Sequence, residues 1–156
     1  MNRALKVMID RVLKEETKSI LDEIDTIINK DGMRNALTRG SKKGDTKPGR
    51  NQFKSLMDAA GKASCVEELV LFLAYQNSKG NGWQNKVNKN TNIAEKITQS
   101  LMSITDKLSE IIETKPEAEN MSIDDKRIMR LIIAEKYLGY LYWSVSALRK
   151  EEKNVS

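Results

Sequence analysis

Ten arginine and lysine residues, gathered in two stretches of the chain, are the side chains whose types and spacing suggest chemistry. Residues 31–63 contain eight basic and three acidic groups, and residues 78–92 contain three basic groups and no acid. Such clusters bind phosphate, because each neutralised phosphate releases counterions without any recognition of base sequence. Together with one tryptophan they form the predicted nucleic-acid-binding set: Arg34, Arg39, Lys42, Lys43, Lys47, Arg50, Lys54, Lys79, Trp83, Lys86 and Lys89.

Two alternatives remain open for these residues. The indole of Trp83, which lies in the run SKGNGWQNKVNKN (residues 78–90), could stack on a base or could anchor its loop onto the helices. The basic side chains could also be a solvated surface that only keeps a lysine-rich chain soluble. Their clustering favours the binding hypothesis, since the two stretches carry more than the whole net charge of +5.

Catalytic and metal-binding equipment is sparse. The chain has no histidine, which removes the commonest general base and the commonest metal ligand. The single cysteine, Cys65, has no Cys or His partner for a zinc site. Asp22, Glu23 and Asp25 are interpreted as a solvated helix face. We therefore expect a protein that is not an enzyme and that needs no cofactor or metal.

The elements that must position the basic stretches are predicted to be helices. The length of 156 residues suits one domain, residues 1–156. Apolar residues recur at three- and four-residue spacing over positions 2–30, which predicts one first helix there. Periodicity stops over residues 31–50, a loop long enough to indicate function or mobility. Residues 53–61 and 64–77 then form a short helical pair, the second started by Ser64-x-x-Glu67, a capping-box pattern.

Two longer helices follow the second basic stretch. Thr91 or Asn92 can cap the first, which has a narrow apolar seam and ends before Pro116. Ser122-x-x-Asp125 starts the second, which runs to about residue 150. Its middle is apolar on nearly every side, so we expect it at the centre of the bundle, with its tyrosines and tryptophan used first of all for packing.

These elements define an all-α, single-domain bundle of about five helices with two long basic loops, which the short helical pair could bring to one end. Residues 1–11 have no signal-peptide core, and the longest uncharged apolar stretch, residues 137–148, is shorter than the about 20 residues that cross a bilayer. We therefore expect a cytoplasmic protein that does not enter the membrane.

Three motifs make the sequence resemble the small all-helical subunits of type III CRISPR interference complexes. The segment GRNQFKSLMDAA contains a polar pair followed by an apolar and a basic residue, EELVLFLAYQNSKG ends an apolar helix in Leu-Ala-Tyr with a basic residue after it, and AEKYLGYLYW lies in a final tyrosine-containing helix. The resemblance covers roughly residues 50–148. The matched residues are Asn51, Gln52, Phe53 and Lys54, then Leu73, Ala74, Tyr75, Gln76 and Lys79, and, more loosely, residues 134–140.

This resemblance implies a non-catalytic subunit of a ribonucleoprotein that stacks with copies of itself and contacts other subunits. It implies that a basic face lines the groove beside guide and target RNA, with Lys54 and Lys79 on the nucleic-acid backbone. The long loop over residues 31–49 and the loop around Trp83 lie outside the family pattern, so their basic residues depend on charge clustering alone. The alternative is a helical adaptor that binds only protein.

Overall fold

The computed structural model describes residues 1–38 and 46–155, and the elements named in those ranges are helices. A π-helical turn (Thr26–Lys30) continues α2, and a 3₁₀ turn (Pro116–Ala118) precedes α7. The all-α class is confirmed, but the number of helices in these ranges exceeds the five expected. The α-helices are α1 (Arg3–Glu15), α2 (Thr17–Asp25), α3 (Met33–Thr38), α4 (Arg50–Lys62), α5 (Val66–Lys79), α6 (Ile93–Glu113) and α7 (Ile123–Val155).

The prediction of one unbroken helix over residues 2–30 was wrong, because the chain bends between α1 and α2. Glu16 leaves the helical conformation at φ −98° and ψ 10°. The hydroxyl of Thr17 donates to the carbonyl of Leu13 at 3.0 Å, a local bond of the kind that bends helices. The buried stripe accordingly skips this point and resumes at Ile20.

A short helix lies inside the segment that the sequence predicted to be a loop. In α3, Met33, Ala36 and Leu37 are buried, at the three-and-four spacing of a helix packed by one face. Helix α3 packs against the π-helical turn, α6 and α7. Its six residues are too short to show periodicity in sequence, and tertiary packing supplies what local propensity does not.

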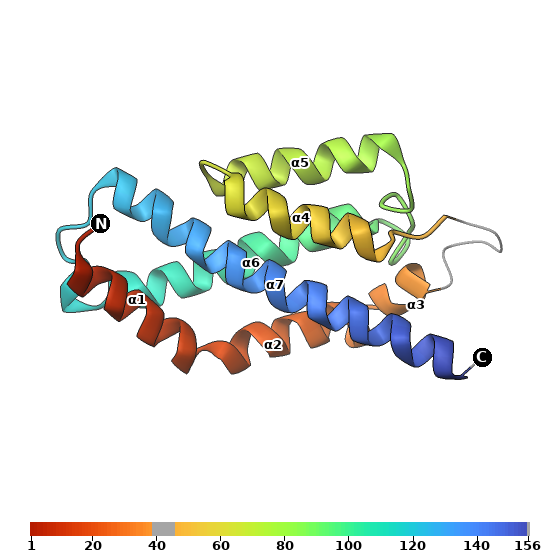
Figure 1. The fold of residues 1–156 in the computed structure, drawn as a ribbon, viewed down its shortest axis with the longest axis horizontal. Helices are drawn as coiled ribbons and strands as arrows, with labels where there is room; N and C mark the ends of the chain where they lie inside the picture. The colour runs from red at the N-terminus through yellow and green to blue at the C-terminus, as the bar shows by residue number, and fades with distance from the viewer. Residues whose placement is uncertain (39–45, 156) are drawn as a thin grey trace.

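Helix α7 lies at the centre of the molecule, as expected. It packs against α2, α3, α4, α5 and α6, and it crosses the whole bundle in Figure 1 with α4 and α5 on one side and α1 and α2 on the other. Tyr137, Leu138 and Leu141 are at most 2% exposed. The expected packing role of its aromatic residues holds for Tyr137, but Trp143 is 66% exposed.

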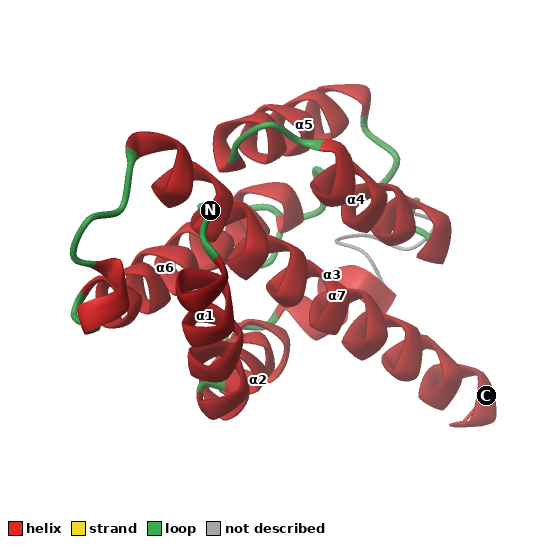
Figure 2. Ribbon diagram, turned by 60° about the vertical axis from the view of Figure 1, so that its left-hand side comes forward, coloured by secondary structure: helices red, strands yellow, loops and turns green. Residues whose placement is uncertain are grey.

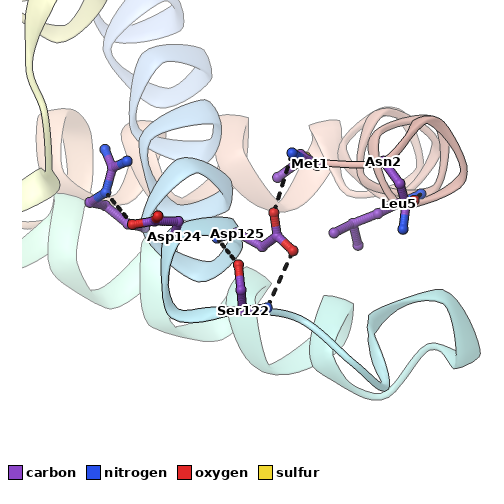
Figure 3. A network of polar contacts seen from close by, with 7 residues as sticks. Met1, Asn2, Leu5, Ser122, Asp124 and Asp125 are labelled. Atoms are coloured by element: carbon purple, nitrogen blue, oxygen red, sulfur yellow. Dashed lines mark hydrogen bonds and ion pairs between the residues drawn. The ribbon is translucent and has the colours of Figure 1, made fainter.

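Polar contacts at helix starts agree with two of the three predicted caps. The side chain of Asn92 accepts from the backbone N–H of Glu95 at 2.9 Å. Ser122 and Asp125 form a reciprocal capping box, with bonds of 3.2 and 3.0 Å (Figure 3). The backbone N–H of Ser122 holds the pKa of the Asp125 carboxyl below its usual value. The amino group of Met1 lies 3.5 Å from the same carboxylate.

The predicted capping box at Ser64 was wrong. Helix α5 starts one residue later, with Cys65 in the N-cap position and no side-chain cap bond. The carbonyl of Ser64 instead accepts from the guanidinium of Arg127 on α7, at 2.6 Å. A tertiary bond to α7 therefore fixes the turn between α4 and α5.

A buried hydrogen-bonded chain ties α7 to α6 and α2. The hydroxyl of Tyr137, which is fully buried, donates to the hydroxyl of Ser100 at 2.7 Å. Ser100 in turn donates to the carboxylate of Glu23 at 2.8 Å. Burial raises the pKa of the Tyr137 phenol above its ordinary value, which disfavours the phenolate in the folded state.

The raised pKa predicts a loss of stability at alkaline pH. Above about pH 10 the phenol ionises in the unfolded chain but not in the folded one, so the unfolded state binds fewer protons and the free energy of unfolding falls as pH rises. Tyr137→Phe should cost about 0.5–1.5 kcal/mol at neutral pH for the missing hydrogen bond. Above pH 10 the difference in the free energy of unfolding between the unaltered chain and Tyr137→Phe should shrink by up to about 1.4 kcal/mol per pH unit. Urea titrations at several pH values measure this difference, and a difference that stays constant would contradict the prediction.

Within the described ranges, no helix combines the length and apolar character that crossing a bilayer requires.

Candidate nucleic-acid interface

The second basic stretch is a loop with a defined conformation, which backbone hydrogen bonds stabilise. Gly80, Asn81 and Gly82 all have positive φ, at 87°, 58° and 91°, a conformation that glycine adopts most easily. The backbone N–H of Ala94 donates to the carbonyl of Trp83 at 3.1 Å, and that of Ile93 donates to Asn85 at 2.9 Å. These bonds fasten the loop to the start of α6.

Trp83 belongs to the core and not to the binding surface. Its side chain is 0% exposed, and its ring packs on that of Phe53 in α4, with centroids 5.0 Å apart. The stacking interpretation of Trp83 was therefore wrong, and the structure has the alternative in which the indole anchors its loop. A ring this size contributes more by burial in the core than it would at the surface.

The two basic stretches contact each other directly, through residues 46–48 of the first and Gly82 and Asn85 of the second. The side-chain amide of Asn85, a residue only 5% exposed, donates to the carbonyl of Thr46 at 2.8 Å. Gly82 lies directly against Lys47 and Pro48, so closely that a Cβ at Gly82 would lie 2.5 Å from the nitrogen of Pro48. We call this contact, made by residues 46–48 with Gly82 and Asn85, the loop joint.

The start of the first stretch also lies near the second loop. The carboxylate of Asp31 pairs with the ammonium of Lys96, in the first turn of α6, at 2.8 Å. A Cβ at Gly32 would lie 3.4 Å from the carbonyl oxygen of Val87. The described residues on both sides of the 39–45 gap therefore contact the second loop or the start of α6.

Several predicted basic residues lie on elements that meet at the end of the bundle where the loop joint lies. Lys47, Lys86 and Lys89 are exposed on the joined loops. Lys54 is exposed in the second turn of α4, and Lys79 is exposed in the last turn of α5, with its ammonium 5.1 Å from the centre of the Tyr75 ring. Figures 1 and 2 show that the start of α4 and the end of α5 lie at the same end of this helical pair.

Other predicted residues are placed elsewhere or lie outside the described part of the chain. The guanidinium of Arg34 donates to the side chain of Asn29 at 3.0 Å, which places it beside the π-helical turn. It lines a hollow of about 300 Å³ there, between α2 and the last part of α7. Arg50 is the first residue of α4. Three predicted residues fall in the range that the structure does not describe: Arg39, Lys42 and Lys43.

The electrostatics of this end favour an anion. Residues 46–57 and 78–92 contain six basic side chains and no acidic one. Helix α4 begins here without an acid in its first turn, so the positive end of its dipole adds to the field. A surface of this kind can hold a phosphate backbone by charge, without recognition of the bases.

Of the residues that form the loop joint, Lys47 was a predicted site residue and the others were not. Gly82, Asn85 and Pro48 carry no charge, so charge clustering does not identify them. The sequence signal available was the pair of glycines around Asn81, since glycine often occurs where another stretch of backbone approaches closely. Which segment approaches them follows only from the tertiary structure.

Comparisons with protein-family models, characterised proteins and solved structures found no match to this chain. In the part of the chain that the structure describes, no three acidic or cysteine side chains gather as metal ligands would.

Proposed function

We propose that this chain is a non-catalytic nucleic-acid-binding subunit that holds a single-stranded RNA backbone on the surface around its loop joint. The loop joint is the observation that carries the proposal, because it brings two acid-free basic segments into direct contact. The resemblance to small subunits of type III CRISPR complexes supports a place beside guide and target RNA, together with other subunits and copies of itself. Lys54 and Lys79, which carry that resemblance, are exposed at this end.

Paired alanine substitutions in each segment test the proposal. Lys47→Ala/Lys54→Ala and Lys86→Ala/Lys89→Ala should each weaken binding of single-stranded RNA and flatten its dependence on salt. Removing one phosphate neutralisation lowers the slope of log K against log salt by about 0.7 for a single strand. Combining the pairs should remove nearly all binding. Fluorescence anisotropy of labelled RNA over a range of salt concentrations measures both quantities, and circular dichroism checks that helicity is unchanged.

A matched control separates a local surface from net charge. Lys6→Ala/Lys14→Ala removes the same charge from exposed positions on α1 and should leave the slope almost unchanged. If it acts as strongly as the loop pairs, the basic residues act only through net charge and the proposal fails. RNAs of equal length and different composition should bind within a few-fold of one another, because phosphate contacts do not identify bases.

One observation favours the adaptor as a second candidate. Leu71 and Tyr75, one turn apart on α5, are 69% and 56% exposed, an apolar surface that suits a protein partner. Purification of the native protein with its bound macromolecules distinguishes the two functions. Co-purified RNA supports the first proposal, whereas a protein partner that stays bound after nuclease treatment, with no RNA affinity in the isolated chain, supports the adaptor.

A further inference from the structure

One large aromatic side chain on the central helix faces solvent. Trp143 is 66% exposed, whereas the other tryptophan of the chain, Trp83, is 0% exposed. The ring of Tyr140 meets Trp143 edge to face, with centroids 5.7 Å apart and planes at 77°. The ammonium of Lys136 lies 5.7 Å from the centre of the Tyr140 ring. The indole is thus held by a neighbouring ring at its side while most of its surface remains open.

A glycine beside this pair has no explanation within the chain. Gly139 lies well inside α7, and glycine in the interior of a helix makes the helix less stable than alanine would. A Cβ built on it meets no atom within 4 Å, so no neighbouring element requires its small size. Gly139 instead lines a hollow of about 130 Å³ together with Glu135, Lys136, Tyr140 and Trp143. The open space above the backbone therefore suits something outside the chain.

A cation lies beside the two rings of this hollow. The side chain of Lys136 is exposed, and its ammonium is the one that lies over the Tyr140 ring. The exposed acid Glu135 lies next to it on the rim. An open aromatic surface with a cation beside it is the combination by which proteins bind single-stranded nucleic acid, with the ring on a base and the cation on a phosphate.

We propose that Trp143 is a stacking platform for a base of single-stranded nucleic acid. The base would lie on the indole and extend over Gly139, and the ammonium of Lys136 would lie beside the phosphate of the same nucleotide. The inference rests on the proposed function, since the joined loops would hold the backbone of the same strand. It assigns to Trp143 the stacking role that the sequence suggested for Trp83. Stacking of one base on an aromatic side chain contributes about 5- to 150-fold in affinity, which is about 1–3 kcal/mol.

Three substitutions and two probes test the platform. Trp143→Ala should weaken binding of single-stranded RNA by about 5- to 150-fold, Trp143→Leu should weaken it similarly, and Trp143→Phe should retain most of the affinity because it keeps an aromatic face. An abasic oligonucleotide of the same length and charge should bind all three variants as tightly as it binds the unaltered chain. Leu71→Ala, which truncates another exposed apolar side chain on α5, is the matched control and should leave both affinities unchanged.

Each contrary result overturns a different claim. Full RNA affinity in Trp143→Ala, alongside weakened binding in the loop variants, refutes the platform and leaves the proposed function intact. Equal weakening for RNA and for the abasic chain shows that Trp143 supports the fold and not a base. Full affinity in Trp143→Leu shows that position 143 makes an apolar contact that needs no aromatic ring, and so refutes stacking. An unaltered chain that binds no RNA refutes the platform and the proposed function together.

Discussion

Replacing Leu141 with aspartate should abolish folding. Leu141 is 1% exposed on α7, the helix against which α2 to α6 all pack. An unpaired carboxylate in that position costs several kcal/mol, against a total stability of about 5–15 kcal/mol for a domain. The measurement is circular dichroism and thermal unfolding of the purified variant, which should be unfolded or insoluble.

Two other positions on α7 set the scale for this result. Ala147→Asp introduces the same charge at a site outside the buried core and should keep the helical fold, with a change of about 0.5 kcal/mol or less. Ile132 is only half-buried, so Ile132→Asp should cost less than Leu141→Asp, although the sequence alone treats the two residues as equivalent. A soluble and fully helical Leu141→Asp protein would show that α7 is not the centre of the core.

Gly82→Ala should break the loop joint. Gly82 has a φ of 91°, which costs a residue with a side chain about 1–3 kcal/mol in strain. Its new methyl carbon would lie 2.5 Å from the nitrogen of Pro48 and 2.6 Å from the carbonyl carbon of Lys47, both backbone atoms that cannot turn aside. We expect the free energy of unfolding in urea to fall by at least about 1–3 kcal/mol, and the affinity for single-stranded RNA to fall with it.

Gly61→Ala is the control, because it replaces glycine with alanine at a position where no other segment lies close. Gly61 lies in α4, and a Cβ there meets no atom within 4 Å, so this substitution should be neutral or stabilise the helix by up to about 1 kcal/mol. If Gly82→Ala lowers stability while RNA affinity stays intact, the two loops bind independently and do not form one surface. Equal stability of the two variants would refute the close approach at Gly82 itself.

The sequence predicted those parts of the fold that local patterns determine. The seam of α6, the apolar circumference of α7 and the caps at Asn92 and Ser122 all follow from spacing within a few turns, and the structure has each of them. The break at Glu16 is harder to predict, because the apolar stripe continues beyond it at nearly the same phase.

Other features depend on residues far apart in the chain. Trp83 sits in a polar, lysine-rich run, and only the arrival of Phe53 from α4 makes its position a core position. The bond between Asn85 and Thr46 spans 39 positions, and neither residue type indicates a partner in sequence. Charge clustering predicted which segments carry the basic groups, but the contact between them comes from backbone fit at Gly82.

The loop joint also bears on the order in which the molecule assembles. It joins Thr46 to Asn85, so the chain between these two residues, which includes α4 and α5, forms a closed loop. Closing a free segment of that length costs about 3 kcal/mol in chain entropy, and less once α4 and α5 have already paired. The basic surface should thus be among the last parts to form. It should be among the first to exchange its amide hydrogens, as a sub-global unit that opens while α6 and α7 remain closed.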